Sequence, residues 1–168
     1  TGYNTDATGF IKSLSGKFTI KNKKVLVLGA GGAGKAIIFS LLASGARRVY
    51  VYDLDKKKAA AVSKTVVGNS ELMKAAEEAD LIVNATPAGM REGPPAINPD
   101  YLKKEHFVYD IVYNRETELI KEAKKRKIAH ANGIEMLLYQ GADAFELWTE
   151  KKAPVGIMRK ALLRALKN

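Results

Sequence analysis

The stretch Lys24–Asp53, KVLVLGAGGAGKAIIFSLLASGARRVYVYD, decides the fold of this chain. It opens with Lys24–Gly29, a run of valine and leucine typical of a strand that is buried on both faces of a parallel sheet. Apolar residues at helical spacing over Gly31–Ala43 predict a helix that ends at Gly45, and Arg48–Asp53 indicates a second strand. The stretch therefore predicts a β-α-β unit of about 30 residues.

Strands and helices continue to alternate along the rest of the chain. We expect further strands at Thr65–Val67, Leu81–Ala85, Phe107–Ile111 and Ile128–His130, the first of them rudimentary, and helices at Ala7–Leu14, Lys56–Lys64, Glu71–Glu78, Thr117–Lys127, Ile134–Trp148 and Pro154–Leu166. This alternation predicts the α/β class, with a doubly wound parallel sheet of the Rossmann type and extra C-terminal helices. The length of 168 residues, without a low-complexity linker, predicts one domain over residues 1–168.

The composition excludes several kinds of site. The chain has no cysteine, which rules out disulfides, iron–sulfur clusters and thiolate metal sites, and its two histidines lack the spacing of a metal motif. We therefore expect no metal. The uncharged segment Ala36–Ala46 is too short for a membrane span, which needs roughly 18 to 20 apolar residues, and Thr1–Phe10 has no secretory signal pattern. The sequence thus predicts a cytoplasmic protein with no membrane partner.

The net charge of +10 raises nucleic acid as a partner, because Lys and Arg drive the binding of phosphates. The lysines are scattered along the chain, however, and they are not interleaved with aromatic residues as a base-stacking surface requires. We therefore predict a solvated, lysine-rich surface and no nucleic-acid partner. General attraction of anionic cofactors and substrates is an alternative use of the same charge.

The turn Gly29–Gly34, GAGGAG, matches the pattern G-x-G-x-x-G between a predicted strand and a predicted helix. The first glycine permits the tight turn, the second lets a pyrophosphate approach the backbone, and the third lets helix and strand pack closely. Free N–H groups at the helix start would then face the phosphates. The residues assigned to the cofactor here are Gly29, Gly31, Gly32, Ala33 and Gly34. The alternative is a glycine-rich turn that serves backbone geometry alone.

Asp53 ends the second predicted strand, where a carboxylate can accept hydrogen bonds from the adenosine ribose of NAD. The 2′-phosphate of NADP would meet a like charge at this position. We therefore favour NAD over NADP as the cofactor, although Lys56–Lys58 could supply compensating positive charge. An aspartate that only caps a turn or a helix is the alternative role for Asp53.

Six further motifs accompany the glycine turn in a fixed order. They are Asn4–Gly9 (NTDATG), Asn84–Met90 (NATPAGM), Asp110–Asn114 (DIVYN), Asn132–Leu137 (NGIEML), Gln140–Gly141 (QG) and Phe145–Thr149 (FELWT). The ordered set resembles the C-terminal half of the shikimate dehydrogenase family, and the resemblance covers essentially all 168 residues. The chain departs from the family where Asp53-Leu54-Asp55 replaces an Asn-Arg-Thr common in NADP-preferring members, and where Arg115 replaces a usual proline.

The resemblance implies an NAD(P)-dependent oxidoreductase that interconverts 3-dehydroshikimate and shikimate in aromatic amino acid biosynthesis. Hydride would move at the nicotinamide C4 while a lysine and an aspartate handle the proton. Asp6 matches the aspartate, whereas the lysine belongs to an N-terminal substrate-binding domain that these 168 residues do not include. The chain alone is therefore expected to be inactive, with helices in residues 1–20 and 133–168 facing that domain. Quinate dehydrogenase and a non-catalytic nucleotide-binding module are the alternatives.

The resemblance also assigns individual residues. Asp6 is the catalytic candidate; Asn4, Tyr113 and Gln140 are candidates for substrate binding; and Asn84, Thr86, Gly133 and Met136 are candidates for cofactor binding, beside the glycine turn and Asp53. The alternatives are structural: a helix cap at Thr5 or Asp6, a Pro-Gly turn over Asn84–Met90, surface or core positions for Tyr113 and Gln140, and core packing for Met136.

Overall fold

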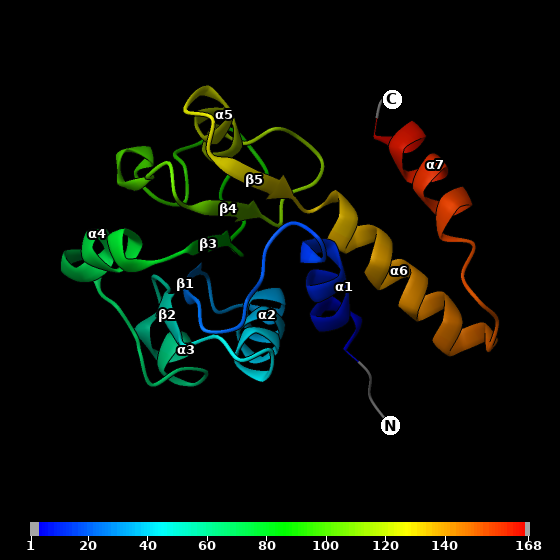
Figure 1. Ribbon diagram of the computed structural model, residues 1–168, viewed down its shortest axis with the longest axis horizontal. Helices are drawn as coiled ribbons and strands as arrows, with labels where there is room; N and C mark the ends of the chain where they lie inside the picture. The colour runs from blue at the N-terminus through cyan, green and yellow to red at the C-terminus, as the bar shows by residue number, and fades with distance from the viewer. Residues whose placement is uncertain (1–3, 167–168) are drawn as a thin grey trace.

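Five parallel strands form the central sheet in the order β2-β1-β3-β4-β5 (Figure 1). They are β1 (Lys24–Leu28), β2 (Arg48–Tyr52), β3 (Leu81–Asn84), β4 (Phe107–Asp110) and β5 (Ala129–Asn132). The computed structural model describes residues 4–166, so residues 1–3 and 167–168 of the predicted domain lie outside the described residues. From β1 the chain builds the sheet first toward β2 and then, on the other side, toward β3. This is the doubly wound topology that the sequence predicts.

The predicted strand at Thr65–Val67 is reduced to a single bridge beside β2. Val66 pairs in parallel with Val51. The N–H of Val51 donates to Thr65 O at 2.9 Å, and the N–H of Val67 donates to Val51 O at 3.0 Å. The bridge adds a rudimentary sixth position outside β2, which completes the strand order of a Rossmann-type sheet.

Helices connect the strands and extend beyond them. They are α1 (Thr5–Leu14), α2 (Gly32–Ala43), α3 (Lys56–Ala60), α4 (Asn69–Glu78), the 3₁₀ helix η1 (Pro99–Tyr101), α5 (Glu118–Lys125), α6 (Ile134–Thr149) and α7 (Val155–Ala165). The predicted bounds hold within a few residues, except that α3 ends at Ala60 instead of Lys64. It stops early because Ser63 already lies beside β2, where its hydroxyl donates to Val49 O at 3.4 Å.

Helices cover both faces of the sheet. On one face α1, α2 and α6 pack against the strands in a core that includes Phe10, Ile37 and Met136. On the other face α4 and α5 form a second core that includes Ala76 and Ile120. The strands β1, β3 and β4 are thus buried on both sides, as their apolar sequences predict, whereas the edge strand β5 is only half-buried.

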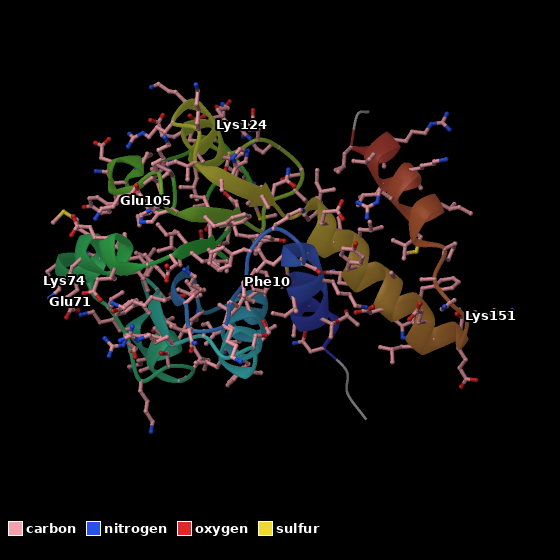
Figure 2. The ribbon with its side chains drawn as sticks, in the orientation of Figure 1. Phe10, Glu71, Lys74, Glu105, Lys124 and Lys151 are labelled. Carbon is pink, nitrogen blue, oxygen red and sulfur yellow. The ribbon has the colours of Figure 1, made fainter. Side chains whose placement is uncertain are left out.

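The charged side chains spread over the outside of the molecule. Lys74, Lys124 and Lys151, which Figure 2 labels, extend from α4, α5 and the segment after α6. Figure 1 shows α7 against the side of α6 that faces away from the sheet, and no residue of Val155–Ala165 is buried. Across residues 4–166, none of the helices combines the length and the hydrophobicity needed to cross a membrane.

Candidate dinucleotide-binding site

The first glycine of the turn, Gly29, directly follows β1 and has a left-handed backbone, with a φ of +100°. Its N–H donates to Tyr52 O at 2.7 Å, which ties the turn to the end of β2. A Cβ atom at Gly29 would lie 2.8 Å from Ala85 O and 2.9 Å from Cγ2 of Thr86. Both the backbone conformation and the crowding therefore require glycine here.

The other glycines of the turn divide into one buried residue and two exposed ones. A Cβ atom at Gly34 would lie 2.2 Å from Gly29 O, so this glycine lets α2 pack closely against the turn, as the motif predicts. Cβ atoms at Gly31 and Gly32 would have no neighbour within 4 Å in the part of the chain that the structure describes. The backbone at these two exposed positions is therefore open to a ligand.

The start of α2 is open in a second sense. Gly31 is its N-cap, and within residues 4–166 no side chain hydrogen-bonds to this helix end as a cap. The first N–H groups of a helix have no partner inside the helix, and they carry the positive end of the helix dipole. Gly32 and Ala33 contribute such N–H groups. An anionic group such as a pyrophosphate suits this end of the helix.

Asp53 links the glycine turn to the end of β2. Its Oδ2 accepts from the Ala30 N–H at 2.7 Å, and its Oδ1 accepts from the Asp55 N–H at 2.8 Å. A carboxylate has about four acceptor positions, so about two remain for ribose hydroxyls. Asp55 caps the helix α3, so Asp53 does not have the helix-capping role that the sequence leaves open for it. The Asp55 Oδ1 accepts from the N–H groups of Lys57 and Lys58 at the start of α3.

A cavity of about 580 Å³ opens beside this turn. It is lined by Gly29, Gly31, Tyr52, Asp53, Leu54, Lys58, Ala85, Thr86, Pro87, Ala88, Pro94, Pro95 and Ala96. Four residues that the sequence assigns to a cofactor, Gly29, Gly31, Asp53 and Thr86, thus share one cavity of the size usual for small-molecule sites. Sequence reasoning misses the loop residues 94–96, because only the folded chain brings them to this cavity.

Asn84 ends β3, and only 1% of its surface is exposed. Its Nδ2 donates to Ala88 O at 3.1 Å and to Asp110 Oδ1 at 3.0 Å. Its Oδ1 accepts from Thr86 N at 3.0 Å and from Thr86 Oγ1 at 2.6 Å. These bonds use both donors and both lone pairs of the amide, so the side chain has no free group for a cofactor. What the structure shows is that Asn84 shapes the loop that carries Thr86 and Ala88 into the cavity.

Asp110 ends β4, opposite Asn84 in the register of the sheet, and is fully buried. Its Oδ2 accepts from Thr117 Oγ1 at 2.7 Å, and its Oδ1 accepts from Val112 N at 3.0 Å as well as from Asn84. Burial raises the pKa of this carboxyl above its usual value, and the three hydrogen bonds oppose the rise. Thr117 also caps α5, because its Oγ1 accepts from Ile120 N at 3.3 Å.

The sequence alone gives Asp110 no role, although the motif DIVYN contains it, and it does not single out Thr117. The available signal is that Asn84 and Asp110 are polar residues at the ends of two otherwise apolar strands. Neighbouring parallel strands end at the same edge of a sheet, so such residues meet when their strands are adjacent. That adjacency of β3 and β4 comes from the fold.

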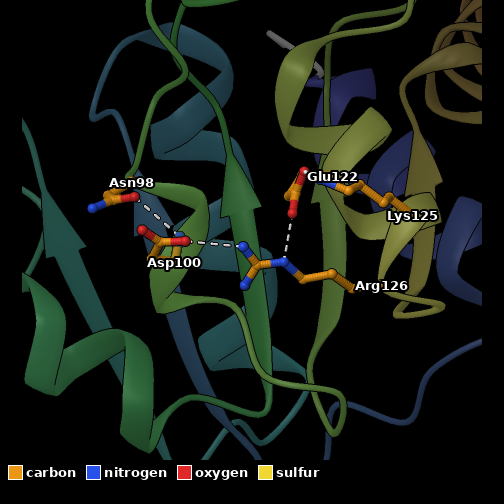
Figure 3. Close-up of polar contacts among 5 residues, drawn as sticks. All are labelled: Asn98, Asp100, Glu122, Lys125 and Arg126. Carbon is orange, nitrogen blue, oxygen red and sulfur yellow. Dashed lines mark hydrogen bonds and ion pairs between the residues drawn. The ribbon is translucent and has the colours of Figure 1, made fainter.

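The far end of the loop that follows β3 is tied to α5 (Figure 3). Arg126 donates from Nε to Glu122 Oε1 at 2.6 Å and from Nη2 to Asp100 Oδ1 at 3.0 Å. Asn98 Oδ1 accepts from the Asp100 N–H at 3.0 Å, which starts η1. The loop between β3 and η1 is thus held at its start by Asn84 and at its end by this ion-pair cluster.

Asn4 and Asp6 lie at the start of α1. The Asn4 Oδ1 accepts from the Asp6 N–H at 3.0 Å, so Asn4 is the helix cap. The structural alternative of a helix cap at Thr5 or Asp6 is therefore wrong, because α1 already begins at Thr5. Asn4 also lines a cavity of about 390 Å³ between α1 and α6, together with Asp143.

The remaining predicted substrate residues lie elsewhere. Tyr113 lines a cavity of about 410 Å³ that also includes Asn132 at the end of β5. Gln140 lies on α6, where Gly9 of α1 approaches so closely that a Cβ atom at Gly9 would be 2.9 Å from Gln140 N. Among residues 4–166, the cavities described do not bring Asn4, Tyr113 and Gln140 together.

Gly133 and Met136 are at the start of α6. A Cβ atom at Gly133 would lie 1.9 Å from Ile111 O, so only glycine lets α6 begin this close to the segment after β4. Met136 is 5% exposed and belongs to the core with Phe10 and Tyr109. Its thioether is enclosed by core residues, so the structure supports core packing, the alternative role for this methionine.

The strand order, the glycine turn and the cavity beside it define an α/β protein with a Rossmann-type fold. A family model described as Shikimate / quinate 5-dehydrogenase matches residues 12–118. A second model, described as Shikimate 5'-dehydrogenase C-terminal domain, matches residues 133–163. The chain therefore belongs to the shikimate dehydrogenase family, as its ordered motifs predict.

Individual relatives agree with this assignment. The chain is 38% identical over 167 residues to a shikimate dehydrogenase (NADP(+)) of Aquifex aeolicus, covering 96% of this chain and 61% of the relative. It is 42% identical over 178 residues to a shikimate dehydrogenase (NADP(+)) of Archaeoglobus fulgidus, covering 99% of this chain and 65% of the relative. The chain thus spans less than two thirds of the length of these relatives.

Solved structures are similar over the same part. The quinate dehydrogenase of Corynebacterium glutamicum in complex with NAD has a TM-score of 0.88 at 34% identity, covering 98% of this chain and 63% of that one. The shikimate 5-dehydrogenase of Thermus thermophilus in complex with NADP(H) and shikimate has a TM-score of 0.83 at 34% identity, with 98% and 63% covered. These relatives bind either dinucleotide, so the comparisons do not support the predicted preference for NAD.

Proposed function

We propose that this chain is the cofactor-binding domain of an NAD(P)-dependent shikimate dehydrogenase of aromatic amino acid biosynthesis. The observation that carries the proposal is the cavity in which the glycine turn, the open start of α2 and the Asp53 carboxylate lie together. Backbone N–H groups and a carboxylate are the groups that a pyrophosphate and a ribose require. The residues present therefore fit a dinucleotide.

The lining of the cavity, the start of α2 and the start of α6 each have a role in this proposal. The N–H groups of Gly32 and Ala33 bind the pyrophosphate, and the missing side chain at Gly31 lets it approach the backbone. The free acceptor positions of Asp53 bind the adenosine ribose, and Thr86 walls the cavity toward the nicotinamide. When bound, the nicotinamide supplies or accepts the hydride. We also assign Gly133 to the nicotinamide end, although it does not line this cavity.

The substrate half of the reaction involves residues outside this cavity. We assign Asp6 to the proton-handling pair, with Asn4, Tyr113 and Gln140 as binding groups for shikimate or 3-dehydroshikimate. A carboxylate beside a lysine orients the amine and tunes its proton affinity. The lysine comes from a substrate-binding domain in this proposal, so the 168 residues alone would bind the cofactor without turnover. That domain faces α1 and the helices of residues 133–168.

We also propose that NAD is preferred over NADP. The support is Asp53, whose carboxylate can accept from ribose hydroxyls and repels a 2′-phosphate. Lys58 lines the same cavity and opposes this effect, since an ammonium group would attract that phosphate. The carboxylate is fixed by two backbone N–H groups, whereas a lysine side chain must be immobilised at an entropic cost. The fixed group therefore decides the preference.

Titration of the chain with NADH and with NADPH, followed by cofactor fluorescence, tests both proposals. We expect NADH to bind more tightly than NADPH, and Asp53→Asn to narrow the difference. Asp55→Asn is the matched control, because it removes a carboxylate two positions away that caps α3 and does not line the cavity. Equal or tighter binding of NADPH would refute the preference, and failure to bind either dinucleotide would refute the cofactor-binding role.

Turnover is tested by joining the chain to the part of the Aquifex aeolicus relative that it does not cover. We expect shikimate oxidation in the joined protein and none in the chain alone. The quinate dehydrogenase structure, with a TM-score of 0.88, makes quinate the second substrate to try. If quinate is oxidised faster than shikimate, quinate is the substrate. Dinucleotide binding without oxidation of either would leave a nucleotide-binding module.

A further inference from the structure

We propose that Asn84, Asp110 and Thr117 act as a positioning unit that holds the cavity wall Thr86–Ala88 against the glycine turn and thereby sets the affinity for the dinucleotide. This inference rests on the proposed cofactor-binding function. It assigns a role to two residues, Asp110 and Thr117, that do not line the 580 Å³ cavity. None of the three side chains contacts the cofactor in this inference.

The connection begins at the wall itself. Thr86 and Ala88 line the cavity, and both are hydrogen-bonded to the Asn84 side chain, Thr86 through its N–H and hydroxyl and Ala88 through its carbonyl. The Ala88 N–H in turn donates to Thr86 Oγ1 at 3.1 Å. Thr86 and Ala88 are therefore hydrogen-bonded both to each other and to the side-chain amide of Asn84. Moving Asn84 would move the wall.

The Asp110 carboxylate fixes the Asn84 side chain by accepting a hydrogen bond from its amide. This carboxylate is fully buried, and its partners are the Asn84 amide, the Val112 N–H and the Thr117 hydroxyl, none of which is a cation. Burying a carboxylate is costly unless its oxygens are hydrogen-bonded. An apolar residue would cost less at this position if packing were its only task. The bonds to Asn84 and Thr117 are what the carboxylate provides.

The methyl group of Thr117 packs against the same loop at Gly89. Gly89 has a φ of +93°, and a Cβ atom there would lie 2.6 Å from Cγ2 of Thr117. The loop after the cavity wall therefore passes directly over the Thr117 methyl group. Since the Thr117 hydroxyl is bonded to Asp110, the start of α5 and the loop share one anchor.

The cavity wall also contacts the glycine turn. A Cβ atom at Gly29 would lie 2.9 Å from Cγ2 of Thr86, so Thr86 touches the tightest point of the turn. A loop released from Asn84 could move into the space above Gly31 or away from it. Either movement changes the width of the cavity where the dinucleotide lies. The expected consequence is a change in affinity.

The test is a fluorescence titration of the 168-residue chain with NADH, well below the unfolding temperature. We expect Asn84→Ala and Asp110→Ala each to weaken binding about tenfold, because each leaves buried partners unpaired. Asp110→Asn should restore most of the affinity. Its amide oxygen can accept from Asn84 and Val112, and its amide nitrogen can donate to the Thr117 hydroxyl.

Ile128→Ala is the control for stability alone. Ile128 is buried in the second core, among the residues that pack with α5, and it lines none of the cavities described for residues 4–166. It should lower the unfolding temperature and leave the dissociation constant for NADH unchanged. A purely structural role for the unit would instead make the Asn84 and Asp110 variants behave like this control.

The outcomes separate the inference from the proposed function. Binding by the wild-type chain with equal affinity in folded Asn84→Ala and Asp110→Ala would overturn the positioning role alone. No binding of NADH or NADPH by the wild-type chain would overturn the proposed function and this inference with it. If the alanine variants do not fold, Thr117→Val removes one hydroxyl at constant shape and should weaken binding about threefold relative to Thr117→Ser. Equal affinity in that pair would also overturn the role.

Discussion

The connection from β1 to α2 and the connection from β4 to α5 leave the same edge of the sheet, yet they are built from different residues. The first is made of glycines, and within the described residues no side chain caps α2. The second is closed by two polar side chains, the buried Asp110 and Thr117, which caps α5. One helix start is left with free N–H groups, and the other is bonded within the protein.

The two connections show how one sheet edge can carry a ligand-binding turn beside a turn that only supports its neighbours. Backbone N–H groups without an internal partner need one from solvent or from a ligand. A helix start that is already capped has less to offer an anion. The glycine turn Gly29–Gly34, the open turn, is therefore the better candidate for the phosphates. The connection Asp110–Thr117, the closed turn, can hold the neighbouring loop in place. Changes at the two turns should consequently have different effects.

The largest effect is expected from Gly34→Ala, because the new Cβ atom would meet Gly29 O at 2.2 Å. Neither backbone can give way easily, so we expect a loss of about 3 kcal/mol or more in the free energy of unfolding. Gly31→Ala is the matched control, since its Cβ atom enters open space, and it should cost less than about 1 kcal/mol. Urea denaturation measures both. Similar losses in the two variants would contradict the division of the turn into a packed and an open part.

Gly31→Asp would turn the open helix start into a capped one. The N-cap residue already has an extended backbone, so the new carboxylate can accept from the first turn of α2. We expect a stability gain of a few tenths of a kcal/mol and, through charge repulsion, about tenfold weaker NADH binding. Gly31→Asn adds the cap without the charge and separates the two effects. Unchanged NADH affinity in the aspartate variant would place the phosphates elsewhere.

At the closed turn, Asp110→Asn tests the buried carboxylate by pH. Burial raises the folded-state pKa of Asp110 above the ordinary 3.8, so folding favours the protonated form. That contribution is fully present below pH 3.8 and is lost as the pH rises through the folded-state pKa. The asparagine variant does not titrate, so its stability relative to wild type should increase over this pH range and then level off. Urea denaturation at a series of pH values measures the difference, and a constant or falling difference would contradict the account.

The smallest effect is expected at the far end of the loop. Arg126→Ala removes the ion pairs to Glu122 and Asp100, but the Asp100 side chain is 80% exposed, so the loss should be about 0.2 to 1 kcal/mol. Lys125→Ala is the control, because Lys125 is 78% exposed and pairs with the same Glu122 at 3.6 Å. It should cost less than Arg126→Ala in thermal unfolding. Equal costs would show that the cluster in Figure 3 does not hold the loop.

The same contrast explains how much the sequence could predict. The open turn is encoded locally: glycines follow a strand and precede a helix, and the role of Gly34 follows from this order. The closed turn depends on Asn84 and Asp110, which are far apart in the chain and meet only because β3 and β4 are neighbours. Met136 shows a related limit, since an apolar residue on a helix has the same pattern whether it faces a core or a ligand.

An NMR titration of the ¹⁵N-labelled chain with NADH tests whether the dinucleotide binds at the open start of α2. We predict that the amide signals of Gly31, Gly32 and Ala33 shift strongly, while those of Leu119 and Ile120 at the start of α5 change little. Strong shifts at the start of α5, with the glycine turn unaffected, would place the cofactor at the other helix start and contradict binding at the glycine turn.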